Sequence, residues 1–151
     1  MGIFHLFLAV LLQAPAPPQA VVVGLTDGQE IVVENPEFTG FIQGRSSDAV
    51  LTYRQKSVHG RMPTNMISRI EFGKYERSKP FPMTVILKNG QVLQVLSEGR
   101  NYLTLGGNTT QGIVRIQHPD PISAPLKLTT RKPNRKKDLT IQYLEFPAPS
   151  E

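Results

Sequence analysis

The sequence predicts an all-β fold made of two small β-barrel units in tandem, with a C-terminal β-hairpin. Residues 21–33 and 84–96 share one pattern, in which Leu-x-(Asp/Asn)-Gly-Gln separates two apolar runs. The 13 prolines and 12 glycines fall between short apolar runs, which is typical of strands joined by turns. No window of residues 21–72 has the spacing of an amphipathic helix. A single β-sandwich is the alternative architecture.

The repeated turn is the strongest local signal. Asp-Gly and Asn-Gly favour a two-residue type I′ turn, in which both central residues take a positive φ. Gly28 and Gly90 adopt a positive φ without a Cβ penalty, and Asp27 and Asn89 tolerate it better than most residues. We therefore expect these four residues to form the turns of two β-hairpins.

The first unit is predicted to cover residues 21–76. After its hairpin turn, Pro36 interrupts the apolar pattern, and turn-like stretches separate the strands that follow. Ile67, Ile70 and Phe72 are expected in the core. The polar stretch 73–82 is the predicted joint to the second unit. The expected strands are 29–34, 38–44, 49–55 and 67–72.

The second unit is predicted to cover residues 77–151. Its glycine-rich stretch 106–111 is expected to be a loop, and the alternating segments 126–130 and 139–146 are expected to pair as the C-terminal hairpin. The other expected strands are 83–87, 91–96, 102–105 and 112–116.

Residues 1–20 are predicted to be a signal peptide. Residues 1–12 form an apolar run that is too short to span a bilayer, and the next eight are rich in Ala and Pro, as a cleavage region often is. We expect a periplasmic or secreted protein that is not an integral membrane protein. A disordered or membrane-interfacial tail, on a cytoplasmic protein, is the alternative interpretation.

The net charge of +5 comes from one segment, residues 127–137, which contains no acid. The chain has 17 Lys and Arg and 12 Asp and Glu, so without this segment it is close to neutral. The segment is either a solvated loop or a polyanion site for nucleic acid, lipid headgroups or an acidic polymer. No aromatic residue lies between Tyr102 and Tyr143, which argues against base stacking. The candidate polyanion-binding residues are Lys127, Arg131, Lys132, Arg135, Lys136 and Lys137.

No local motif indicates catalysis or a bound metal. The chain has no cysteine, and neither His59 nor His118 has a second ligand type at metal-binding spacing. Nucleophile-elbow and paired-carboxylate patterns are missing. We therefore expect a non-enzymatic protein with no metal and no small-molecule cofactor.

Each half resembles the small bent barrels of the SH3-like and Sm-like kind. In the second half, Leu87-x-x-Gly90 followed by the segments 101–105 and 112–116 is similar to the two short Sm motifs. In the first half, Leu25-x-x-Gly28 is followed by the segments 40–42, 49–51 and 67–70. The acidic-x-Asn signature of base-binding Sm proteins is absent from residues 97–101. The resemblance therefore implies the barrel shape but not RNA binding.

Two functional hypotheses follow from the sequence. The first is an exported, non-enzymatic binding or scaffold module of the cell envelope, whose partner is an unidentified protein or envelope polymer. The second is an intracellular nucleic-acid or polyanion-binding protein that uses residues 127–137.

Overall fold

The prediction of an all-β fold is confirmed by the computed structural model, which describes residues 20–45, 48–73, 79–98, 102–118 and 141–147. No helix in these ranges is long and apolar enough to cross a membrane. A 3-10 turn, η2 (Thr64–Met66), separates β5 from β6. The strands are β1 (Ala20–Leu25), β2 (Glu30–Gly40), β3 (Ile42–Arg45), β4 (Val50–Gln55), β5 (Val58–Pro63), β6 (Ile67–Phe72), β7 (Pro82–Leu87), β8 (Val92–Ser97), β9 (Leu103–Thr109), β10 (Gly112–His118) and β11 (Ile141–Glu145).

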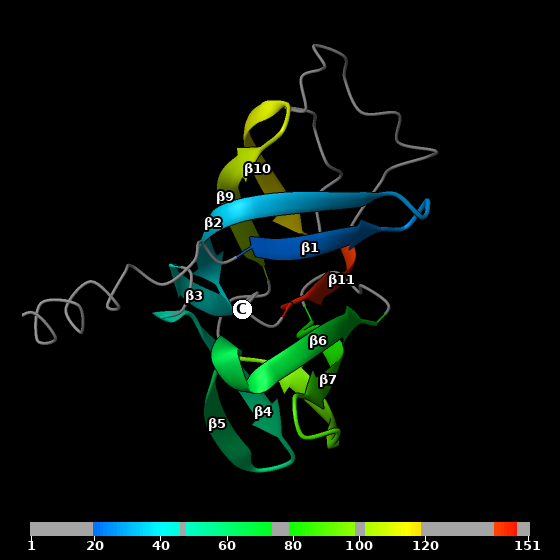
Figure 1. Cartoon of the computed structure of the whole chain (residues 1–151). Helices are drawn as coiled ribbons and strands as arrows, with labels where there is room; N and C mark the ends of the chain where they lie inside the picture. Colours follow the sequence, from blue (N-terminus) through cyan, green and yellow to red (C-terminus); the bar gives the residue numbers. More distant parts are fainter. Residues whose placement is uncertain (1–19, 46–47, 74–78, 99–101, 119–140, 148–151) are drawn as a thin grey trace, which may run out of the picture.

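Eight strands close into one antiparallel barrel (Figure 1). Their order is β1-β11-β6-β7-β8-β4-β3-β2, and the pairing of β2 with β1 completes the ring. The hairpin β9–β10 continues the sheet from β2, and β5 continues it from β4. Closure matters because it leaves these eight strands without a free sheet edge along the ring.

The two predicted units share this barrel instead of each closing its own. β8 of the second unit pairs with β4 of the first, and β11 lies between β1 and β6 of the first. Neither half would bury enough apolar surface alone, and strands from one half satisfy the edges of the other. Because β1 and β6 occupy both sides of β11 from Tyr143 to Glu145, the backbone partners of this segment come from the first half. The other predicted arm of the C-terminal hairpin, residues 126–130, lies outside the described residues.

The strand β2 bends sharply and continues through the expected break at Pro36. Asn35 has a φ of +50°, and the register of β2 against β9 shifts between Glu34 and Glu37, as in a β-bulge. Proline is tolerated at a bulge because no ladder hydrogen bond is needed there. The bend lets β2 pair with β1 before the bulge and with β3 and β9 after it. It therefore connects the barrel to the β9–β10 extension.

Apolar side chains fill the barrel interior. Phe41 is fully buried, and its ring centroid lies 5.9 Å from that of Phe72 and 5.7 Å from that of Phe81. Ile67 and Ile70 are fully buried as expected, and Phe72 packs against the core while half-buried. Phe81 is also fully buried, although it belongs to the predicted polar joint. The joint therefore anchors β7 to the core.

The repeated Leu-x-(Asp/Asn)-Gly-Gln segments form the same loop twice. Gly28 N–H donates to the Leu25 oxygen (2.9 Å), and Leu25 N–H donates to the Gln29 oxygen (2.8 Å). Gly28 has a φ of +92° and Gly90 of +90°, whereas neither Asp27 nor Asn89 has a positive φ. This is a three-residue loop, in which a type I turn is followed by a left-handed glycine, and the two-residue type I′ prediction is wrong.

Candidate functional site

Four of the sequence-predicted site residues are described, Asp27, Gly28, Asn89 and Gly90, and they lie in two separate hairpin loops. Asp27 Oδ1 accepts the Gln29 N–H (2.9 Å), and the same contact ties Asn89 to Gln91 in the other hairpin (2.9 Å). The four turn residues thus stabilise two separate loops. The six predicted polyanion-binding residues, Lys127, Arg131, Lys132, Arg135, Lys136 and Lys137, lie outside the described part of the chain.

A groove of about 420 Å³ lies on the outer face of β2, β9 and β10. Sequence reasoning did not identify it, because its lining comes from strands that are far apart in the sequence. Figure 1 shows β9 and β10 at one end of the molecule, next to β2, and β4, β6 and β7 at the other end. The groove is lined by Asn35, Glu37, Thr39, Thr104, Gly106, Gly107, Ile113, Val114 and Arg115.

Sheet register explains why the groove is hollow. Glu37 is the direct partner of Gly106, and Gly106 is the direct partner of Arg115. These three residues therefore form one row across β2, β9 and β10, with neighbouring strands about 4.8 Å apart. The middle position has no side chain, so an acid and a base flank an open stretch of backbone.

The two glycines of the groove floor differ in function. A Cβ at Gly107 would lie 2.8 Å from the Glu34 backbone oxygen and would also overlap the Val33 side chain, so only glycine allows β2 to approach this closely. A Cβ at Gly106 would meet only the Val114 oxygen, at 3.7 Å. Gly106 therefore leaves space that a ligand can use. The expectation that residues 106–111 form a loop is wrong for Gly106–Thr109, which belong to β9.

The charges of the groove leave one cation available. Glu37 Oε2 lies 3.6 Å from Arg45 Nε on β3, in an exposed ion pair. Within the described ranges, Arg115 forms no ion pair. Beside it, the side chain of Ile113 is 80% exposed, the highest value among the large exposed hydrophobic residues. The β10 side of the groove thus presents a guanidinium next to an uncovered apolar side chain.

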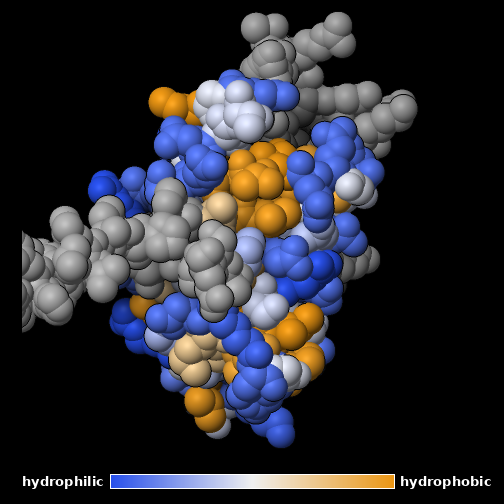
Figure 2. Space-filling view, viewed as in Figure 1, coloured by the Kyte–Doolittle hydropathy of each residue, from blue (hydrophilic) through white to orange (hydrophobic). Residues whose placement is uncertain are grey.

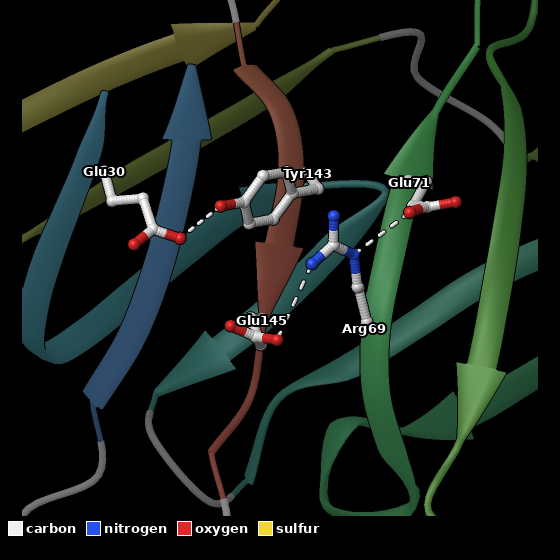
Figure 3. A network of polar contacts seen from close by, with 5 residues as sticks. All are labelled: Glu30, Arg69, Glu71, Tyr143 and Glu145. Carbon is white, nitrogen blue, oxygen red and sulfur yellow. Dashed lines mark hydrogen bonds and ion pairs between the residues drawn. The ribbon is translucent and has the colours of Figure 1, made fainter. Parts of the chain in front are cut away.

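A second polar cluster surrounds Tyr143 (Figure 3). The Tyr143 hydroxyl donates to the Glu30 carboxylate, and the Arg69 guanidinium stacks 3.8 Å above the centre of the Tyr143 ring. Arg69 also pairs with Glu71 (3.1 Å) and Glu145 (3.6 Å). These contacts connect β2, β11 and β6 across the outer surface of the barrel.

The contacts of the Tyr143 cluster fit a structural role in closing the barrel better than a catalytic role. The Tyr143 ring covers Gly24, its cross-strand partner on β1, where any Cβ would overlap the ring. The pKa of Tyr143 is raised, first because its hydroxyl donates to Glu30 and then because the group is partly desolvated. A tyrosine with a raised pKa stays neutral and acts as a hydrogen-bond donor.

His59 and Glu98 are a further pair of titratable side chains on the described surface. His59 Nδ1 lies 2.5 Å from Glu98 Oε2 in an exposed contact. No group of three or more metal-ligating side chains is present in the part of the chain that the structure describes.

Val22 and Val32 are direct partners on β1 and β2, and Figure 2 shows an apolar area over these strands with hydrophilic residues around it.

Comparisons of this chain with protein-family models, with curated proteins and with solved structures find no match.

Proposed function

We propose that this protein is an exported, non-enzymatic binding module that holds its ligand in the groove on β2, β9 and β10. The packed interior carries this proposal. Phe41, Leu51 and Leu105 are among the core side chains that are fully buried inside the barrel, so the space for a ligand is on the outside. The groove of about 420 Å³ has the size of a ligand site.

The groove lining is suited to recognition. Thr39 and Thr104 are direct partners, and their hydroxyls can donate and accept hydrogen bonds. The carboxylate of Glu37 is held by Arg45, and Arg115 supplies a positive charge. Hydrogen-bonding groups and one available charge fix the orientation of a ligand, which is the role of polar groups in binding sites.

Export is supported by the position of the first strand. β1 begins at Ala20, directly after the apolar run 1–12 and the Ala- and Pro-rich stretch that follows it. Within the described residues, removal of residues 1–20 would cost the barrel the pairing of Ala20 with Glu34, at the end of the β1–β2 ladder. The rest of that ladder, from Val21 to Gly24, would remain after cleavage there.

The test is a pull-down from extracts of the source organism, combined with mass spectrometry of the mature N-terminus. We expect a chain that begins near Val21 and a ligand that the parent protein retains. Gly106→Tyr fills the groove from a position with no close backbone neighbour, and it should release that ligand. Val92→Tyr is the matched control, because Val92 is 55% exposed on β8 and does not line the groove.

The circular dichroism spectrum and the thermal unfolding of both variants are first compared with those of the parent protein. Equal ligand recovery with folded Gly106→Tyr and Val92→Tyr would contradict the groove as the site. An intact Met1 in the native protein would contradict export and would favour the second candidate, an intracellular polyanion-binding protein. That candidate is favoured by the six Lys and Arg residues within residues 127–137.

A further inference from the structure

Within the described residues, the strand β10 has an edge without a neighbouring strand, next to the groove. Among the described strands β10 pairs only with β9, from Gly112 to His118. On an edge strand, every second residue turns its N–H and C=O groups away from the sheet, where another strand can pair with them. β5 also has one described neighbour, β4, but the groove does not extend beside it. β10 therefore combines a backbone edge with a side-chain site.

Two side chains of β10 define what this site would select. Ile113 and Arg115 both line the groove and are two residues apart, so they point to the same face about 6.6 Å from each other. A strand paired with β10 would place its own residues at the same spacing. An acidic residue opposite Arg115 would form a charge-assisted hydrogen bond, and an apolar residue two positions away would cover Ile113.

We propose that the groove and the free edge of β10 bind an extended peptide segment that carries an acidic residue two positions from an apolar one, by adding it to the sheet as a strand. This inference rests on the proposed function, because it names the ligand class of the same groove. Backbone hydrogen bonds would supply affinity, and Arg115 and Ile113 would supply selectivity. Gly106 lies on the other side of Arg115, where its missing side chain leaves the Arg115 side chain room to adjust toward the peptide.

The charges and lining favour a foreign peptide over the other occupants. If two copies of β10 paired antiparallel about Arg115, each Arg115 would lie opposite its own copy, and like charges directly opposite each other destabilise a sheet. A single-stranded nucleic acid would gain from aromatic platforms, and the groove lining contains no aromatic residue. An acidic peptide complements Arg115, which forms no ion pair with another described residue.

The first experiment uses three peptides with the sequence Thr-Val-Thr-X-Thr-Val-Thr, where X is Glu, Gln or Lys. Binding to the mature protein is measured by fluorescence anisotropy. We expect the Glu peptide to bind about tenfold more tightly than the Gln peptide, and the Lys peptide to bind most weakly. N-methylation of alternate peptide amides, which removes backbone donors but keeps the side chains, should abolish binding.

The second experiment locates the peptide on the protein. Hydrogen–deuterium exchange should show new protection of β10 amides when the Glu peptide is bound, with no change in β5. Arg115→Gln should weaken binding of the Glu peptide about tenfold and leave the Gln peptide unchanged. Gly106→Tyr places a ring directly beside Arg115 and should weaken binding of the Glu peptide, and Val92→Tyr should leave both peptides unchanged.

Three results would overturn the inference: equal affinity for all three peptides, protection of β5 instead of β10, or a protein dimer that protects β10. Its failure can be told apart from failure of the proposed function. If Gly106→Tyr releases the native ligand in the pull-down while none of the peptides binds, the groove is a binding site for another class of ligand. If Gly106→Tyr changes neither the recovery of the native ligand nor the affinity for the peptides, both proposals fail together.

Discussion

Ser97 is a buried polar residue whose hydroxyl serves the backbone of a neighbouring segment. Ser97 is 2% exposed, and its Oγ accepts a hydrogen bond from the Phe81 N–H (2.8 Å). Ser97→Ala would leave that buried N–H without this acceptor, so we expect a loss of about 1–3 kcal/mol in the free energy of unfolding, measured with urea. Thr84→Ala removes an exposed hydrogen bond to Gln94 and should change this free energy by less than about 0.5 kcal/mol. Equal effects would contradict the assigned role of Ser97.

Tyr143 makes stability depend on pH at the alkaline end. Its pKa in the folded protein lies above the model value of 10.0, chiefly because the hydroxyl donates to Glu30. The hydrogen bond therefore contributes fully below the unfolded pKa, and its contribution is lost as pH rises through the folded pKa. Ultraviolet titration of the parent against Tyr143→Phe should assign the late-titrating group to Tyr143. Glu30→Gln should move this pKa back toward 10.0. An unchanged titration in Glu30→Gln would contradict this cause.

At the scale of the strand, the two neighbouring glycines of β9 should respond differently to substitution. Gly107→Ala places a Cβ against the Glu34 oxygen and Val33, and we expect it to destabilise the protein by about 1–3 kcal/mol. Gly106→Ala meets no close atom and should be neutral or stabilise by up to about 1 kcal/mol, because alanine lowers the entropy of the unfolded chain. Thermal unfolding of the two variants measures the contrast. Similar effects of both substitutions would mean that Gly107 is not a close-packing position.

The same strands show which parts of the fold can be predicted from sequence patterns. Alternation of apolar and polar residues identified most strands, including the segments that became β4, β6, β7 and β8. The patterns failed at Pro36 and at Gly106–Gly107, since proline and glycine usually end strands. Here Pro36 lies at a bulge, and Gly107 lies where β2 packs closely on β9. Both positions depend on a partner strand that is distant in the sequence. The groove could not be predicted for the same reason.

At the scale of the molecule, we expect the pairing of β11 with β1 and β6 to make the barrel one cooperative unit. Its Leu144 is fully buried and pairs with Val23 of β1 and Ile70 of β6. Leu144→Ala should cost about 2–5 kcal/mol, and it should lower the unfolding midpoint equally for probes in residues 21–76 and in the rest of the barrel. Native-state hydrogen exchange of β4 and β7 makes this comparison. Separate midpoints for the two regions would instead indicate two independent units.

The internal repeat predicted two equal units because both copies form the same hairpin, but local similarity does not determine which strands become neighbours. The β1–β2 hairpin pairs with β11, β3 and β9, whereas the β7–β8 hairpin pairs with β6 and β4. These pairings are set by the need to close the sheet and to bury one common core. The all-β class and a barrel could therefore be predicted from the sequence, but the sharing of one ring by both units could not.

The last prediction concerns the basic segment 127–137. If its cations bind a polyanion, the interaction is mainly electrostatic, and binding should weaken steeply with salt. Changing Arg135, Lys136 and Lys137 together to Ala should reduce the slope of log affinity against log salt by about 3 for duplex DNA, since each neutralised phosphate contributes about 0.9. Filter binding across a salt series measures this slope.

Stability gives the control for that triple variant. Surface substitutions away from caps and cores usually change the free energy of unfolding by less than about 0.5 kcal/mol, so the melting temperature should stay close to that of the parent. Gly106→Tyr should leave the salt slope unchanged, because it alters the groove and adds no charge. If the triple variant binds DNA with the same slope of log affinity against log salt as the parent, the segment serves only to keep the protein soluble. The groove would then be the remaining candidate site among the described residues.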